Sequence, residues 1–153
     1  MTVLASIRPH DIDLALFFHV GGAMILVGGL FTAACATIVG WRDESQRLRR
    51  FAVMTLLAVA LPGWIVMRAA AEWTYSKEHL NDLPSDPTWI GIGFVVSDIG
   101  GLLLLIALVL GGVGMRRSRR GEGDTLLRTS GAIAAILLVA YAVVVWAMGA
   151  KPS

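Results

Sequence analysis

The stretch PGWIVMRAAAEWTYSKEH, residues 62–79, decides how the rest of the chain is read. It begins as apolar sequence of the kind found in membrane-spanning helices, and it admits Arg68 before the apolar character ends. On a helix, steps of three and four residues return to the same side, which places the following residues on one face: Trp64, Arg68, Glu72, Tyr75 and His79. An ionisable residue within a spanning helix is costly, and it usually faces the protein interior with a partner. The stretch therefore predicts both a membrane helix and a polar site.

The composition is that of an integral membrane protein. Of the 153 residues, 56% are hydrophobic and 16% are charged, against about 45–50% and about 25% in soluble domains. The apolar residues form four long blocks, at about 12–41, 51–73, 89–115 and 126–148, and each is long enough to cross a bilayer as a helix. We therefore predict an all-α fold, in which residues 1–153 form a single transmembrane domain built as an integral membrane four-helix bundle.

The basic residues predict how this bundle sits in the membrane. Nine of the thirteen lysines and arginines lie in or next to the segments 42–50 and 116–125. Cytoplasmic loops of membrane proteins are enriched in these two residue types, which places both segments in the cytoplasm. The loop 74–88 and both termini then lie outside, an N-out/C-out arrangement. The expected location is the cell membrane, as a multi-pass protein.

Small residues follow one side of the first predicted helix. Alternating steps of three and four residues connect His19, Gly22, Leu26, Gly29, Ala33, Ala36 and Gly40. Small side chains at this spacing let helix backbones approach closely in lipid, where packing drives the association of helices. We expect this side to be the packed face, with His19 turned inward.

Pro62 interrupts the second predicted helix from within. Proline lacks the N–H that would bond the carbonyl of Ala58, four residues earlier in the chain. Sharp kinks in long helices are found mostly at proline. Prolines in membrane helices need no functional role, because neighbouring groups satisfy the freed carbonyl. We predict a kink here and assign it no further role.

Three ionisable residues on three predicted helices lie at matching depth. At about 1.5 Å per helical residue, His19, Arg68 and Asp98 are each roughly 8–14 Å below the outer ends of their helices. Arg68 and Asp98 have opposite charges, and Glu72 lies one turn above Arg68, within reach of it. We predict one buried cluster and a ligand-binding site composed of His19, Arg68, Glu72, Asp98 and Trp64.

The cluster supports several chemical hypotheses, and whether the chain is an enzyme stays open. The first is a site for a small ligand or for a redox cofactor such as haem. Haem would take His19 as one axial ligand, with Met67 or Met148 as the other, or with His10 or His79 folded in. Copper(I) is an alternative metal for His19 with these methionines, since imidazole and thioether ligands suit it. A proton relay through the cluster is a further option.

Two other hypotheses assign the cluster no chemistry. In one, the chain is a non-catalytic accessory or structural membrane subunit, and a buried pair of Arg68 and Asp98 is a strut that fixes helix register. In the other, it is a small transporter or channel, which would need several copies because four helices leave little room for a pathway. The expected partners are the lipid bilayer and either further copies in a homo-oligomer or a larger membrane complex.

The sequence also argues against some kinds of protein. The single cysteine, Cys35, excludes an intrachain disulfide and a multi-cysteine metal cluster. The arginine clusters lie at helix ends, where membrane topology and anionic lipid headgroups explain them, so nucleic acid is not expected as a partner. The sequence has no phosphate-binding glycine loop and no nucleophile elbow.

Three stretches resemble those of small bacterial membrane proteins. They are LFFHVGGAMILVGG at 16–29, PGWIVMRAAAEWTYSKE at 62–78 and DPTWIGIGFVVSD at 86–98. They resemble families of predicted four-helix integral membrane proteins of unknown function, of actinobacterial type, and the resemblance covers the chain as a whole. The stretch 19–29 is also similar to copper-resistance D-type and HemJ-like membrane domains. That second resemblance implies copper handling or haem-linked redox work.

Overall fold

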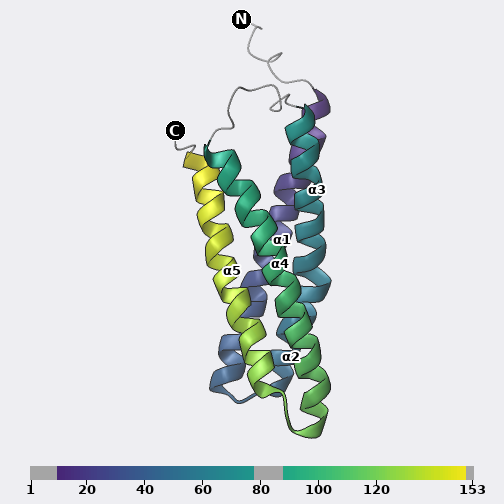
Figure 1. The fold of residues 1–153 in the computed structure, drawn as a ribbon, viewed down its shortest axis with the longest axis vertical. Helices are drawn as coiled ribbons and strands as arrows, with labels where there is room; N and C mark the ends of the chain where they lie inside the picture. The colour runs from purple at the N-terminus through teal and green to yellow at the C-terminus, as the bar shows by residue number, and fades with distance from the viewer. Residues whose placement is uncertain (1–9, 78–87, 151–153) are drawn as a thin grey trace, which may run out of the picture.

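The computed structural model describes residues 10–77 and 88–150, and within these ranges it is all-helical. In chain order the elements are α1 (His10–Arg42), α2 (Gln46–Thr55), the π-helical turn η1 (Leu56–Ala60), α3 (Leu61–Lys77), α4 (Thr88–Arg117), the 3-10 turn η3 (Ser118–Arg120) and α5 (Asp124–Ala150). The elements α2, η1 and α3 run on from one another, so the bundle has four long rods (Figure 1). The all-α prediction is confirmed.

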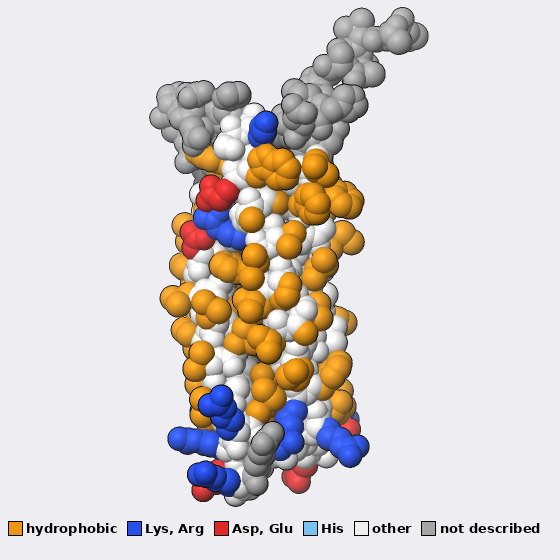
Figure 2. Space-filling view, turned by 90° about the vertical axis from the view of Figure 1, so that its right-hand side faces the viewer, with side chains coloured by type: hydrophobic (Ala, Val, Ile, Leu, Met, Phe, Trp, Pro, Cys, Tyr) orange, Lys and Arg blue, Asp and Glu red, His pale blue; other side chains and the backbone are white. Residues whose placement is uncertain are grey.

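All four rods are long and apolar enough to cross a membrane. The qualifying segments are Leu14–Arg42, Gln46–Lys77, Ile90–Arg117 and Asp124–Ala147, with 29, 32, 28 and 24 residues. About 20 residues are enough to span the hydrocarbon core of a bilayer. The outward faces of the rods are apolar, with Phe17, Met24 and Trp146 among their most exposed side chains. Figure 2 shows a broad apolar surface between the ends of the bundle, which monomeric soluble proteins rarely expose.

The two ends of the bundle differ in charge. At the end that we call the terminal end, α1 begins, α3 ends, α4 begins and α5 ends (Figure 1). The opposite end, which we call the basic end, carries the α1–α2 turn and the segment between α4 and α5. Basic side chains gather there in Figure 2. The segments 42–50 and 116–125, in which the sequence concentrates its arginines, therefore lie together at one end.

The predicted loops are shorter than expected, because helix extends into each of them. Helix α2 begins at Gln46, within the predicted loop 42–50, and the Ser45 side chain caps it by accepting from the Leu48 N–H at 3.5 Å. Helix α3 continues to Lys77, and α4 continues to Arg117. These boundaries were wrong because charge ends an apolar run without ending a helix, since Arg, Lys, Gln and Glu are good helix formers. The segment 78–87, which includes His79, lies outside the described residues.

The irregularity expected at Pro62 takes the form of a widened turn. The π-helical turn η1 directly precedes Leu61 and Pro62, and the N–H of Leu61 bonds the carbonyl of Leu56, five residues back. A π-helical turn inside a long helix re-pairs backbone groups around an interruption. The last residue of the turn, Ala60, lies against Gly29 of α1, where an added Cβ would meet the Ala60 nitrogen at 2.9 Å.

Helix α1 is the central packing partner in the bundle. It packs along α3 and α5, and α4 packs along α5, whereas α3 and α4 touch little. The packed face predicted on α1 is confirmed: Leu26 and Ala33 are fully buried, and Gly22 lies against the backbone of Met67. The largest fully buried apolar side chains are those of Leu26, Leu30, Leu56, Leu104, Leu127 and Leu137. The core therefore follows the α1 face that the sequence marks with small residues.

Candidate functional site

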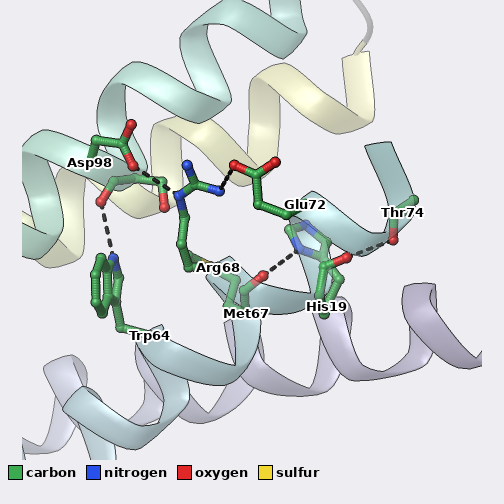
Figure 3. Close-up of polar contacts among 9 residues, drawn as sticks. His19, Trp64, Met67, Arg68, Glu72, Thr74 and Asp98 are labelled. Atoms are coloured by element: carbon green, nitrogen blue, oxygen red, sulfur yellow. Dashed lines mark hydrogen bonds and ion pairs between the residues drawn. The ribbon is translucent and has the colours of Figure 1, made fainter. Parts of the chain in front are cut away.

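Arg68 connects α3 to α4 in the terminal half of the bundle. Its Nε donates to Asp98 Oδ1 at 2.8 Å, and its Nη1 donates to Glu72 Oε1 at 2.5 Å (Figure 3). The guanidinium carbon lies 4.9 Å from the centre of the Phe94 ring, a cation–π contact. The predicted pairing of Arg68 with both carboxylates is confirmed.

The prediction that this cluster is buried is wrong for the carboxylates. The Arg68 side chain is 22% exposed, but those of Glu72 and Asp98 are 57% and 58% exposed. Ser97 points inward, and one helical step of about 100° turns Asp98 toward the outside. Figure 2 shows acidic and basic side chains together amid apolar surface toward the terminal end. Matching depth predicted the contact between the residues, but it could not predict which side of the α3–α4 seam they occupy.

Trp64 bridges the α3–α4 seam, the line along which these two helices meet, one turn below Arg68. Its Nε1 donates to the carbonyl of Ser97 at 3.0 Å (Figure 3). A Cβ at Gly101 would overlap the indole ring, so the ring lies directly on the α4 backbone. The hydroxyl of Tyr141, from α5, reaches the same Ser97 carbonyl at 3.5 Å. Trp64 is therefore a bridge between α3 and α4.

A cavity of about 710 Å³ lies in the terminal half, between α1, α3, α4 and α5. Small-molecule sites are typically about 300–1,000 Å³. The wall is mostly apolar, and its polar or aromatic-polar side chains are His19, Arg68, Thr74, Tyr75, Ser97 and Tyr141. The lining includes Val20 and Met24 of α1 and Val145 of α5, which are also exposed on the outside of the bundle. The cavity therefore opens sideways between α1 and α5.

His19 supplies this cavity with an imidazole. Its Nδ1 lies 3.1 Å from the carbonyl oxygen of Met67 (Figure 3). A carbonyl oxygen only accepts, so Nδ1 carries the proton and donates. Within the part of the chain that the structure describes, Nε2 has no hydrogen-bond partner, and in the neutral ring it holds a lone pair. A histidine that binds through Nε2 is commonly oriented by such an Nδ1–H···O=C bond.

Ser97 of the cavity lining contributes a second unpaired polar atom, which is buried next to the cavity. The residue is 7% exposed, and its Oγ is buried without a hydrogen-bond partner. Thr74, by contrast, donates its hydroxyl proton to the carbonyl of Ala70 at 2.9 Å. Sequence reasoning missed Ser97, because a single serine in a glycine-rich apolar helix belongs to no motif. Its position next to Asp98, whose pairing with Arg68 was predicted, was the one available signal.

The cavity does not provide the opposed axial ligands expected for haem. A six-coordinate haem in a bundle takes ligands from facing helices. Met67 belongs to the same wall as His19, since its carbonyl accepts the His19 bond. Among the described residues, the facing α4 and α5 walls present Ser97, Tyr141 and apolar side chains, and neither an imidazole nor a thioether. The side chains of His10 and Met148 and the whole of His79 lie outside the described part of the chain.

Few groups near His19 could bind copper. The described residues contain no group of three or more His, Cys, Asp or Glu side chains that could hold a metal. The thioethers of Met24 and Met67 line the same cavity as His19, and Met24 is largely exposed on the outside. Cys35 is a free, exposed thiol that does not line the cavity. Copper binding therefore stays a prediction from the sequence.

A second arginine–aspartate pair, which sequence reasoning missed, lies at the basic end. Arg49 of α2 is 6% exposed, and its Nη1 donates to the carbonyl of Gly40 at 2.6 Å. Its Nη2 lies 2.6 Å from Asp124 Oδ1, an ion pair by distance that lacks the angle of a hydrogen bond. Asp124 Oδ2 lies 2.6 Å from Arg128 Nε. This pair ties α2 to the end of α1 and to the start of α5.

Together these features define a class of protein: an all-α bundle of four membrane-length helices with an apolar cavity in its terminal half. A single oriented imidazole and a single unpaired hydroxyl mark the described wall of that cavity. No protein-family model matches the chain, and neither a curated protein nor a solved structure matches it. The function is therefore argued from the site itself.

Proposed function

We propose that this protein crosses the cell membrane four times and binds a lipophilic small molecule in the cavity of its terminal half. The observation that carries the proposal is the apolar cavity of about 710 Å³, lined by an imidazole that is held in place and has an open Nε2. Apolar walls with a few oriented polar groups are the usual make-up of small-molecule sites. The sideways opening between α1 and α5 would admit a molecule dissolved in the bilayer.

The distribution of basic residues supports an orientation with the terminal end outside. Arginines of the segments 42–50 and 116–125 lie at the basic end, which the enrichment of cytoplasmic loops in Lys and Arg assigns to the cytoplasm. The cavity then lies in the outer leaflet. The test is a Ser76→Cys variant in a Cys35→Ser background, treated with a membrane-impermeant maleimide. Ser76 is exposed near the terminal end, so we expect labelling in intact cells, whereas labelling only in broken cells would reverse the orientation.

In this proposal the predicted site residues have different roles. His19 contacts the ligand directly. Arg68 forms part of the wall, and Asp98 and Glu72 hold it there from outside the cavity, which neither of them lines. Trp64 braces the seam below. The two carboxylates are therefore positioning residues and do not contact the ligand.

A cavity-filling variant tests the proposal, with 4-octylphenol as the lipophilic probe. Binding to the folded state stabilises it by RT ln(1 + [L]/Kd), about 1.4 kcal/mol at ten times Kd, so the unfolding temperature of the detergent-solubilised wild type should rise saturably. Ala71 lines the cavity, and Ala71→Phe should abolish the rise.

The matched control for this experiment is Ala69→Phe on the same helix. Ala69 is exposed and does not line the cavity, so this variant adds the same ring outside the proposed site. It should keep the wild-type response to the probe. An equal rise in both variants would mean that the probe acts elsewhere, and it would contradict binding in this cavity.

A further inference from the structure

The unpaired polar atoms of the cavity wall define the chemistry of the ligand, an inference that rests on the proposed function. We infer that the ligand carries a hydroxyl group, which donates its proton to His19 Nε2 and accepts a hydrogen bond from the Ser97 hydroxyl. The rest of the ligand is apolar and fills the remaining cavity. The ligand class is thus a lipophilic phenol or alcohol.

The tautomer of His19 sets the first requirement. Because Nδ1–H is committed to the carbonyl of Met67, the neutral ring offers only a lone pair at Nε2. A lone pair needs a donor, so a ligand that presents only an ether or carbonyl oxygen leaves it unpaired. A hydroxyl group satisfies it.

Ser97 sets the second requirement. Its buried Oγ lacks a partner, and leaving a buried hydroxyl unpaired is costly. The Ser97 hydroxyl both donates and accepts, so it can give a hydrogen bond to the oxygen of the same ligand hydroxyl. The two atoms belong to facing walls, since His19 lies on α1 and Ser97 on α4.

The contacts of α3 place His19 and Ser97 at one level of the bundle. His19 bonds the backbone of Met67, and the next residue, Arg68, bonds Asp98, the residue that follows Ser97. Met67, which His19 contacts, directly precedes Arg68 in the sequence, and Ser97 directly precedes Asp98. His19 and Ser97 therefore border the cavity at about the same depth along the bundle.

The neutral side-chain donors of Trp64, Tyr141 and Thr74 around this level are already used. Trp64 Nε1 and the Tyr141 hydroxyl both point to the backbone carbonyl of Ser97, which leaves its side chain free. Arg68 uses its Nε on Asp98 and one N–H of Nη1 on Glu72, and its remaining N–H groups are still donors beside this wall. Thr74 donates to the carbonyl of Ala70. Besides the spare N–H groups of Arg68, the unmet hydrogen-bonding capacity of this wall is one acceptor at His19 and one hydroxyl at Ser97. The His19 acceptor is the one that calls for a donor on the ligand.

The test compares 4-octylphenol with 4-octylanisole, its methyl ether, which keeps the oxygen but loses the donor proton. Dissociation constants are measured by calorimetry on the full chain in detergent, with Ala71→Phe as the reference for partitioning into micelles. In the wild type we expect the phenol to bind about tenfold more tightly, because the ether leaves Nε2 unpaired. His19→Phe should bring the two probes to within about twofold of each other, since neither then meets an open acceptor.

Ser97→Ala separates a ligand contact from a structural role. It should weaken phenol binding about threefold or more, because the ligand oxygen loses its donor. The ligand-free variant should keep the wild-type unfolding temperature or exceed it, since the deleted Oγ is buried and has no partner in the protein. A lower unfolding temperature together with unchanged phenol binding would make Ser97 structural and overturn its assignment.

The outcomes distinguish this inference from the proposed function. Cavity binding of both probes with equal affinity in the wild type would overturn the hydroxyl inference and leave the lipophilic site intact. Absence of any binding that Ala71→Phe removes would overturn both. If His19→Phe does not fold, Ser97→Ala still decides, because its removed atom makes no contact that folding needs.

Discussion

Two arginine–aspartate pairs join helices of this bundle, and they differ in burial. Arg49 is enclosed at the basic end, where it bonds a helix-end carbonyl and pairs with Asp124. Arg68 lies in the terminal half, and its partner Asp98 faces outward. By sequence position, Arg68 is the intramembrane arginine and Arg49 belongs to a charged connecting segment. Burial follows the packing of the helices, and the depth of a residue in an apolar segment does not predict it.

The packing of α5 toward the basic end differs from that of α3 against α4 in the terminal half. Toward the basic end, Gly131 of α5 lies so close to Thr37 of α1 that a Cβ would overlap the threonine side chain. The Ser130 hydroxyl also donates to the carbonyl of Ala107 in α4 at 2.8 Å. In the terminal half, α3 and α4 are bridged by side chains, and the cavity lies behind that bridge. The tight half holds the helices together, and the loose half leaves space for a ligand.

The largest effect that this comparison predicts is the loss of Arg49. Breaking a buried ion pair by removing one partner costs about 3–5 kcal/mol. Asp124 is 42% exposed and keeps Arg128 as a partner, so we expect Arg49→Met to cost about 1–3 kcal/mol, below that range, mainly because the Gly40 carbonyl loses its buried donor. The measurement is the free energy of unfolding in mixed detergent and denaturant.

Arg47→Met is the matched control for this variant. Arg47 lies on the same helix two residues earlier and is exposed, so its loss should change the free energy of unfolding by about 0.5 kcal/mol or less. Similar small losses for Arg47→Met and Arg49→Met would mean that Arg49 is not enclosed in solution. The two arginine–aspartate pairs would then not differ in burial.

The features that the sequence predicted were those that depend on a repeat or on spacing. The four helices follow from long apolar blocks, and the packed face of α1 follows from its small residues at steps of three and four. The contact of Arg68 with Asp98 and Glu72 followed from opposite charge, helical spacing and matching depth. Each of these features depends on residue spacing within one helix or on the depths of residues in two helices. None of them depends on how each helix is rotated about its own axis.

The features that the sequence could not predict depend on helix rotation and on long-range approach. Whether Asp98 faces the cavity or the outside depends on the orientation of α4, which Trp64 and Gly101 fix through contact with α3. The pairing of Arg49 with Asp124 joins segments 75 positions apart in the sequence, as the two numbers show. Neither relation can be recognised from the spacing of residues along one helix.

The smaller effect, and the sharper test of the comparison, concerns Asp98. If the Arg68–Asp98 pair were a buried strut, as the sequence suggested, Asp98→Ala would be strongly destabilising, and adding Arg68→Leu would restore stability. The carboxylate is more than half exposed, and Arg68 keeps Glu72. Ion pairs exposed to water contribute about 0–1 kcal/mol. Asp98 faces the surroundings within a membrane-length helix, but Arg68 keeps Glu72 as its charged partner, so we expect Asp98→Ala to cost about 1 kcal/mol in detergent.

A double-mutant cycle of Asp98→Ala and Arg68→Leu measures the coupling directly. A coupling below about 1 kcal/mol agrees with an exposed pair, whereas one of about 3 kcal/mol would match a buried pair. Because both carboxylates lie on the outer surface of one chain, strong coupling would require a low-dielectric surface against them, either lipid or another protein. A homo-oligomer or a larger membrane complex, closing over the α3–α4 seam, would supply that surface. The same cycle, run in detergent and in lipid bilayers, would show whether that cover forms only in the membrane.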